Sequence, residues 1–252
     1  MTWAAKTHAL MRRIVFTLPD ETFLEILSYF PAINFRYGFA HQRGLSNPNV
    51  LSGGYAERCN VLRAITQTCR ALRQKFLPWL WEGVDACAVP YDRAWYVYLG
   101  NLLENKCRIL LKNPVLAAHV RLANICFLYS TLSHTVDSVM SVTLSRHRMN
   151  TVLPTFASCL QSLPNLHTLG VCHAHRDMTT KLEAAFKGVT IPSIRTIVIP
   201  TVAHNILRSC PNVEDVTCND GDGSQILSSI ASKCPKVKRI SDMNPPLARL
   251  KC

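Results

Sequence analysis

The chain has 252 residues, of which 48% are hydrophobic and 17% are charged, and its formal net charge is +12. A chain of this length and composition can bury a sizeable core as one large domain or two small ones, which excludes an intrinsically disordered protein. The charge is spread evenly, with a net of +5 over residues 1–82, +3 over residues 83–180 and +4 over residues 181–252. Because phosphate binding requires positive charge gathered on one face, this distribution argues against nucleic acid as a partner.

The eleven cysteines show no Cys-x-x-Cys spacing, and most of them have apolar neighbours. This pattern predicts buried free thiols in a reducing compartment rather than a disulfide framework. No secretory signal is visible, because charged residues interrupt the apolar residues of segment 1–16. The most apolar long window, 114–132, contains His119 and Arg121, so we expect no membrane span. The predicted location is cytoplasmic or nuclear.

The first predicted element is a helix that follows a leader at residues 1–16. Pro19 suits the first helical position, and Asp20 and Glu21 place negative charge in the first turn. Pro31 then ends the helix. One face carries apolar residues at helical spacing: Phe23, Ile26, Leu27 and Phe30.

Residues 32–57 contain four glycines and show no hydrophobic period, which predicts a long exposed loop. A helical pattern resumes at residue 58, with an apolar stripe that runs through Cys69 to Leu72. The apolar run "KFLPWLWEG" follows, and Gly83 is a plausible helix end. The segment 83–114 predicts a linking helix, with the helical pattern at 91–113 and Pro114 at its end.

The C-terminal part, residues 115–245, predicts strands and short helices in alternation, before a tail at 246–252. The segment 120–127 is β-rich and is expected to be the first strand. Four later segments share one pattern around prolines 164, 192, 211 and 235, at intervals of 28, 19 and 24 residues, close to the period of leucine-rich-type repeats. Helical stretches are expected at 152–162, 179–187, 203–209 and 224–233. This alternation predicts a parallel sheet with helices along one side. The residues expected to stack in its core are Leu166, Leu169, Val171, Ile194, Ile197 and Ile199.

Residues that could carry chemistry do not form a recognisable site. His173 and His175 would share one face of a strand, but no second pair is placed to complete a tetrahedral metal site. The segment "NDGDGSQ" at 219–225 lacks the later acidic ligand of a calcium loop, and a turn before a helix, capped by Asp222 or Ser224, explains it. No nucleophile or metalloprotease motif is present. We therefore expect a protein that is not an enzyme and that needs no cofactor and no metal.

The segment 17–82 resembles the F-box family. The residues that carry the resemblance are the Leu-Pro pair with Glu21 behind it, the Ile-Leu pair in the first helix, a Cys-Arg pair in a later helix and a terminal Leu-Trp pair. The loop at 32–57 departs from the family, whose members join the first two helices by a few residues. An interrupted F-box followed by irregular repeats is similar to the F-box proteins that are numerous in mushroom-forming fungi.

The resemblance implies a mixed α+β or α/β fold, in which a small helical F-box-like module precedes an irregular solenoid of the leucine-rich-repeat type. It also implies a substrate-recruiting adaptor for protein ubiquitination, whose partners are a Skp-type linker subunit, through it a cullin–RING ligase, and a substrate protein. Leu18, Pro19 and Leu24 are the stronger candidates for contact with the partner, and the residues expected to lie mostly in the core are Phe23, Ile26, Leu27 and Phe30. The full set of residues expected at the linker interface is Leu18, Pro19, Leu24, Ile26, Leu27, Cys69, Leu72, Leu80 and Trp81.

A second reading leaves out ubiquitin ligation. In that reading the chain is a repeat-type scaffold for protein interaction, and the N-terminal helices cap the open end of the repeat stack, because such stacks need a cap. The substrate, the repeat surface that would bind it and the oligomeric state do not follow from the sequence.

Overall fold

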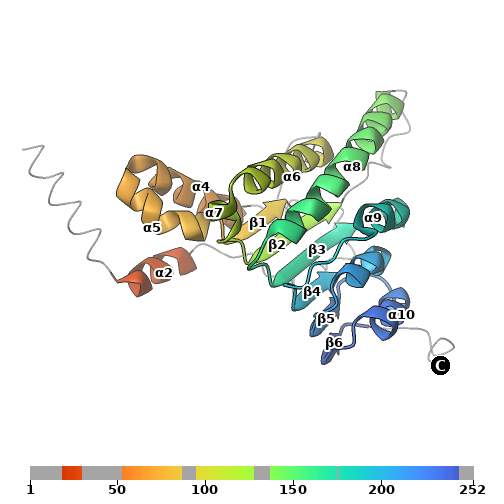
Figure 1. Cartoon of the computed structure of the whole chain (residues 1–252). Helices are drawn as coiled ribbons and strands as arrows, with labels where there is room; N and C mark the ends of the chain where they lie inside the picture. The colour runs from red at the N-terminus through yellow and green to blue at the C-terminus, as the bar shows by residue number, and fades with distance from the viewer. Residues whose placement is uncertain (1–18, 30–52, 87–94, 128–136, 175, 244–252) are drawn as a thin grey trace, which may run out of the picture.

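A parallel six-stranded sheet, open at both edges, forms the centre of the computed structural model, which describes residues 19–29, 53–86, 95–127, 137–174 and 176–243 (Figure 1). The strands follow one another in chain order, from β1 to β6. They are β1 (Gly83–Ala86), β2 (Leu122–Phe127), β3 (Thr168–Ala174), β4 (Thr196–Ile199), β5 (Asp215–Cys218) and β6 (Arg239–Ser241).

Helices join each described strand to the next and line one face of the sheet (Figure 1). The α-helices of this layer are α6 (Trp95–Lys112), α7 (Pro114–Ala117), α8 (Asp137–Ser162), α9 (Thr179–Phe186) and α10 (Ser224–Lys233), and the 3-10 helices are η2 (Arg176–Met178) and η3 (Thr201–Ser209). Successive helices pack on one another, α6 on α8, α8 on α9, α9 on η3 and η3 on α10. The fold is therefore a mixed α/β fold with parallel strands, as the strand–helix alternation predicts.

The main core lies between the sheet and this helix layer. The six strand residues expected to stack there are all 1% exposed or less. The parallel register aligns them, since Leu169 lies opposite Ile197 and Ile197 lies opposite Val216. The asparagines that follow Pro164 and Pro211 connect neighbouring strand–helix units by hydrogen bonds. The Asn165 side-chain amide donates to the carbonyl of Ala118 (2.7 Å), and the Asn212 side-chain amide donates to the carbonyl of Pro192 (2.9 Å).

The sequence predicts that segment 120–127 forms the first strand of the sheet. This prediction is wrong, because another strand precedes it. Residues Gly83–Ala86 form β1, which pairs in parallel with β2. The segment expected to be a linking helix therefore starts with a strand, and its helix α6 joins the main core through Leu103, Cys107 and Leu110. Four residues with a glycine and a buried aspartate give no alternating pattern, so periodicity could not find this strand.

A buried polar pair connects β1 to β2. Asp85 is 6% exposed and accepts a hydrogen bond of 2.5 Å from the side-chain amide of Asn124, which lies opposite it in the register. The Lys106 ammonium donates to the Asp85 carbonyl oxygen at 2.9 Å. Burial raises the pKa of Asp85 from 3.8 to about 6, against the opposing effects of Lys106 and Asn124.

Three further helices form a separate unit next to β1 (Figure 1). They are α2 (Asp20–Ser28), α4 (Gly53–Thr68) and α5 (Arg70–Leu80), and together they are called the helical module below. Two details of the predicted helices need correction. Helix α4 starts at Gly53, so the last five residues of the expected loop 32–57 are helical, while 32–52 lie outside the described residues. The stripe across 58–72 also spans two helices, because Cys69 is extended (φ −155°, ψ 163°) between α4 and α5.

Candidate protein-binding surface

The helical module has a small hydrophobic core of its own. Phe23 from α2, Leu62 from α4 and Phe76 from α5 are all less than 9% exposed and cluster together. The Phe23 and Phe76 rings meet edge to face with their centroids 4.9 Å apart, and Phe76 meets Trp79 in the same manner at 5.1 Å. This cluster is distinct from the main core, so the module holds its shape through contacts among its own helices.

The junction between α4 and α5 follows from local side-chain hydrogen bonds. The hydroxyls of Thr66 and Thr68 donate to the carbonyls of Arg63 and Ile65, which is the back-bonding that bends or ends helices. Arg73 then donates its Nε hydrogen to the carbonyl of Thr66 (3.1 Å) and joins the two helices. The result is a tight helical pair against which α2 packs its phenylalanine.

The candidate partner-binding residues divide into exposed and half-buried groups. Pro19 and Leu24 are exposed, and Leu24 is 53% exposed although its neighbour Phe23 is buried. Leu72 and Leu80 are half-buried against the module's own core. Cys69 is half-buried at the helix junction, where its carbonyl accepts the Arg73 N–H at 3.0 Å.

The remaining candidates lie elsewhere or outside the described part. Leu18 and Phe30 are outside the described residues, and Ile26 and Leu27 are placed only as part of the α2 backbone. Trp81 follows α5 directly and packs against the main core rather than the module's core. The Leu80–Trp81 pair therefore lies between the two cores: Leu80 packs against the module's core and Trp81 against the main core.

Sequence reasoning missed Tyr29, which is 79% exposed at the end of α2. Leu24 and Tyr29 are two of the most exposed large hydrophobic side chains among the described residues; Leu24 lies on α2 and Tyr29 directly follows it. Tyr29 lies outside the Phe23–Phe30 stripe, and an aromatic residue outside the buried stripe of an amphipathic helix is the signal that could have identified it.

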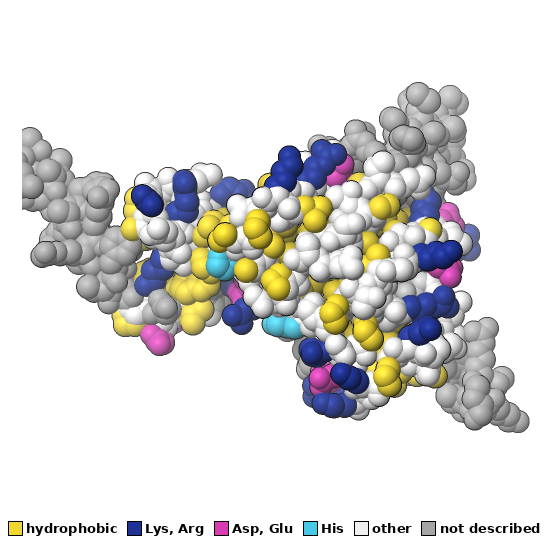
Figure 2. Space-filling view, in the orientation of Figure 1, with side chains coloured by type: hydrophobic (Ala, Val, Ile, Leu, Met, Phe, Trp, Pro, Cys, Tyr) yellow, Lys and Arg dark blue, Asp and Glu magenta, His cyan; other side chains and the backbone are white. Residues whose placement is uncertain are grey.

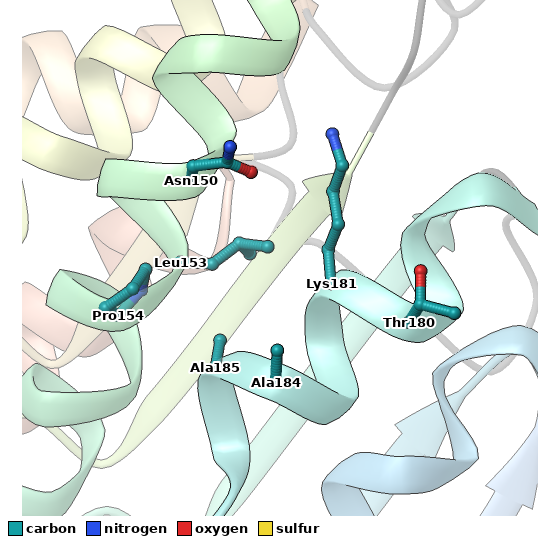
Figure 3. Close-up of a pocket in the computed structure, with 7 residues that line it drawn as sticks. All are labelled: Asn150, Leu153, Pro154, Thr180, Lys181, Ala184 and Ala185. Carbon is teal, nitrogen blue, oxygen red and sulfur yellow. The ribbon is translucent and has the colours of Figure 1, made fainter.

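A hollow of about 310 Å³ lies between α8 and α9 on the helix layer (Figure 3). Figure 3 shows Asn150, Leu153 and Pro154 of α8 facing Lys181 and Ala185 of α9 across it. The hollow forms because alanines on α9 and a proline on α8 leave space between the helices. Its lining contains no His, Cys, Asp or Glu among the described residues, so they offer no pair of groups for acid–base chemistry.

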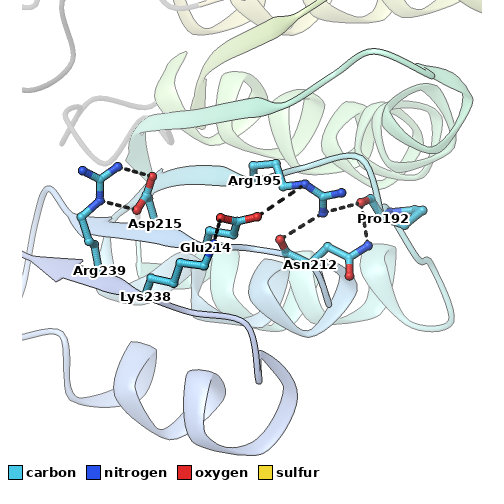
Figure 4. A network of polar contacts seen from close by, with 7 residues as sticks. All are labelled: Pro192, Arg195, Asn212, Glu214, Asp215, Lys238 and Arg239. Carbon is cyan, nitrogen blue, oxygen red and sulfur yellow. Dashed lines mark hydrogen bonds and ion pairs between the residues drawn. The ribbon is translucent and has the colours of Figure 1, made fainter.

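The other face of the sheet carries polar residues near β4, β5 and β6. A second hollow of about 370 Å³ lies there, lined by side chains that include Thr196, Thr217 and Ser241. Asp215 and Arg239 lie along one part of it and form a bidentate ion pair, in which Arg239 Nε donates to Asp215 Oδ1 (2.6 Å) and Arg239 Nη2 donates to Asp215 Oδ2 (2.8 Å) (Figure 4). This is the face on which the described helices of the layer do not lie.

A line of charges follows the starts of these strands (Figure 4). Glu214 lies between Arg195 (3.9 Å) and Lys238 (2.6 Å), and the hydrogen bond from Lys238 lowers the pKa of Glu214. Arg195 also donates to the carbonyls of Pro192 and Asn212. The ion pairs and hydrogen bonds of these residues connect the segments that precede β4, β5 and β6.

Comparison with protein-family models, with curated proteins and with solved structures finds no match for this chain. Among the described residues, no helix is both long enough and apolar enough to cross a membrane. The same residues contain no cluster of three or more His, Cys, Asp or Glu side chains that could hold a metal ion. Of the histidine pair considered for a metal, His173 is placed only as part of the β3 backbone, and His175 lies outside the described residues.

Proposed function

We propose that the chain is a non-catalytic adaptor of a Skp–cullin–F-box type ubiquitin ligase. The helical module would bind the Skp-type linker, and the sheet domain would hold a substrate protein close to the site of ubiquitin transfer. The gain from such an adaptor is a raised effective concentration of the substrate.

One observation carries this proposal. The segment with the F-box-like residues folds as a separate helical module with its own aromatic core, and it leaves Leu24 and Tyr29 exposed. Exposed large apolar side chains next to a residue that is buried in a core are typical of a docking site for another protein. The polar helix-free face of the sheet, with its hollow around Thr196 and Ser241, supplies a second surface for the substrate.

A binding assay between the full-length protein and a purified Skp-type linker tests this proposal. Leu24→Asp removes an exposed apolar contact without touching the buried cluster, so we expect it to weaken binding by about tenfold or more, which is the effect of an interface hot spot. Ile240→Asp is the matched control, because Ile240 is 46% exposed on β6 at the far edge of the sheet. Absence of linker binding by the folded wild-type protein would refute the proposal.

The scaffold reading is favoured by a different observation. Trp81 packs on the main core directly before β1, so the helical module adjoins the first edge of the sheet and could serve as its cap. Deletion of residues 1–80 separates the two functions. A cap predicts that the remaining sheet domain unfolds or aggregates, whereas an independent docking module predicts a folded remainder with a cooperative thermal transition.

A further inference from the structure

The basic residues of the helical module gather on α4 and α5. Helices α4 and α5 carry five basic residues and one acidic residue, Glu57, whose side chain lies outside the described part of the structure. Arg63, Arg70 and Arg73 are exposed, while Arg58 and Lys75 are partly exposed. Figure 2 shows several of the cationic side chains over these two helices. The net charge of +5 over residues 1–82 hides this concentration, because α2 contributes three of the five acidic residues in that segment.

Within the described part of the chain, the arginines of α4 and α5 have no acidic partner. The Arg63 guanidinium donates to the Asn60 amide oxygen (3.1 Å), and among the described residues no ion pair includes Arg58, Arg63, Arg70 or Arg73. On the sheet domain, several exposed cations are paired, as in Arg108–Glu104 (2.6 Å), Arg208–Glu183 (3.1 Å) and Arg239–Asp215 (2.6 Å). Other exposed cations there, such as Lys187 and Lys236, are in no ion pair among the described residues, so the helical module differs in having its unpaired arginines on two adjacent helices.

Arg70 also lies where it disfavours its own helix. Helix α5 begins at Arg70, with Arg73 in the same first turn and no acidic residue there. The N-terminal end of a helix carries partial positive charge, so a cation at this position opposes the helix dipole. The side chain of the N-cap residue Cys69 does not cap the helix with a hydrogen bond. A side chain that weakens its own helix is more readily explained by a role in binding than by a role in the fold.

The neighbouring helix indicates a protein rather than a nucleic acid as the partner. Helix α2 packs on α5 through Phe23 and Phe76, and it exposes Glu21 and Glu25 together with the apolar Leu24 and Tyr29. A continuous polyanion would be repelled by these carboxylates and would gain little from the exposed Leu24 and Tyr29. A protein surface can instead place acidic groups against α4 and α5 and apolar groups against α2.

We propose that the outer face of α4 and α5 docks an acidic surface of the protein that the helical module binds, and that this attraction raises the affinity of the complex. The inference rests on the proposed function, because it takes the Skp-type linker as the carrier of that surface. It adds the electrostatic character of the partner and names Arg63 and Arg70 as residues that recognise it.

The experiment measures the affinity of the full-length protein for a purified Skp-type linker at two salt concentrations. Exposed charges are screened strongly between about 50 and 500 mM salt, so we expect the wild-type affinity to fall about tenfold or more over this range. The double variant Arg63→Glu/Arg70→Glu should bind about tenfold more weakly at low salt and should lose most of the salt dependence. The matched control is Lys187→Glu/Lys236→Glu, which makes the same change in net charge at exposed positions on the sheet domain and should bind like the wild type.

A thermal melt of Arg70→Glu separates binding from folding. Because a carboxylate in the first turn of α5 would agree with the helix dipole, the variant should melt about 1–4 °C higher than the wild type, although it binds more weakly. If the Glu variants prove poorly folded, Arg63→Gln/Arg70→Gln gives the same test with half the charge change.

The outcomes distinguish this inference from the proposed function. Linker binding that is equally tight at both salt concentrations and in both double variants overturns the inference and leaves the adaptor function standing. Failure of the linker to bind at either salt concentration overturns both. Binding of a fluorescent single-stranded oligonucleotide that Arg63→Glu/Arg70→Glu abolishes, with no effect on the linker, would assign the arginines to nucleic acid and would also overturn the inference.

Discussion

At the scale of single residues, Asp85 is the clearest case of a group whose burial works against the fold. Its pKa rises from 3.8 to about 6 because it loses solvent, so the folded state binds its proton more tightly than the unfolded state does. The cost to stability is absent below about pH 4, grows as the pH rises through about 4 to 6 and is complete above about pH 6. A pKa shift of this size lowers the free energy of unfolding by about 3 kcal/mol above about pH 6.

Asp85→Asn removes this charge and keeps an oxygen that can accept the hydrogen bond from Asn124. We expect the variant to have a higher free energy of unfolding at about pH 7, by about 1–3 kcal/mol, and a similar one near pH 4. Chemical denaturation at both pH values measures the difference. A gain that is equal at the two pH values, or a loss at the higher one, would show that the charge of Asp85 is compensated in the fold.

Two glycines with left-handed backbone give a matched pair of variants. Gly223 before α10 has φ +74°, and a Cβ placed there would lie 2.5 Å from the Met243 sulfur. Gly188 after α9 has φ +77°, and a Cβ there would meet nothing within 4 Å. Gly188→Ala should cost about 1 kcal/mol for the backbone alone, and Gly223→Ala should cost more because Met243 must move. Equal losses in denaturation experiments would contradict the steric account of Gly223.

At the scale of elements, the module and the sheet domain have separate cores, and this separation has a measurable consequence. Phe76 is 2% exposed at the centre of the module's core, so Phe76→Ala should remove about 3–5 kcal/mol of packing there. Amide hydrogen exchange should then accelerate in α4 and α5 while β3, β4 and β5 keep their protection.

Phe156→Ala is the counterpart in the main core, where the Phe156 side chain is 1% exposed. It should reduce protection in the sheet. If Phe76→Ala loosens the strands as much as Phe156→Ala does, the chain unfolds as one cooperative unit and the module is not independent.

The elements that the sequence predicted well are those with a strong period. Strands β3 to β5 and helices α9 and α10 were predicted at nearly their observed positions, because residues such as Leu169 and Ile197 repeat at fixed offsets from a proline. Strand β1 escaped prediction because the burial of Asp85 depends on its pairing with Asn124 on another strand. Tertiary contacts of this kind have no local sequence signal.

The candidate surface could be predicted only in part. The exposure of Leu24 was expected from its position outside the apolar stripe, and the structure places it so. Trp81 stays a predicted linker contact, and its packing against the main core could not be predicted, because that depends on the angle at which the chain leaves α5. The arginines were overlooked because charge counted over long segments loses the local excess on two packed helices.

At the scale of the whole molecule, two parts of the chain are proposed to have two roles. The helical module, with exposed Leu24 and Tyr29 beside a cationic helical pair, is proposed to dock the linker. The helix-free face of the sheet, with its polar hollow at β4 to β6, is proposed to hold the substrate. The network around Glu214 keeps the strand starts of that face tied together.

Hydrogen–deuterium exchange of the full-length protein, with and without a saturating Skp-type linker, tests the central claim most directly. We expect the linker to slow exchange in α2 and along α4 and α5, and to leave β3, β4 and β5 unchanged. Protection confined to the sheet domain, or no protection in the helical module at saturating linker, would contradict the adaptor function.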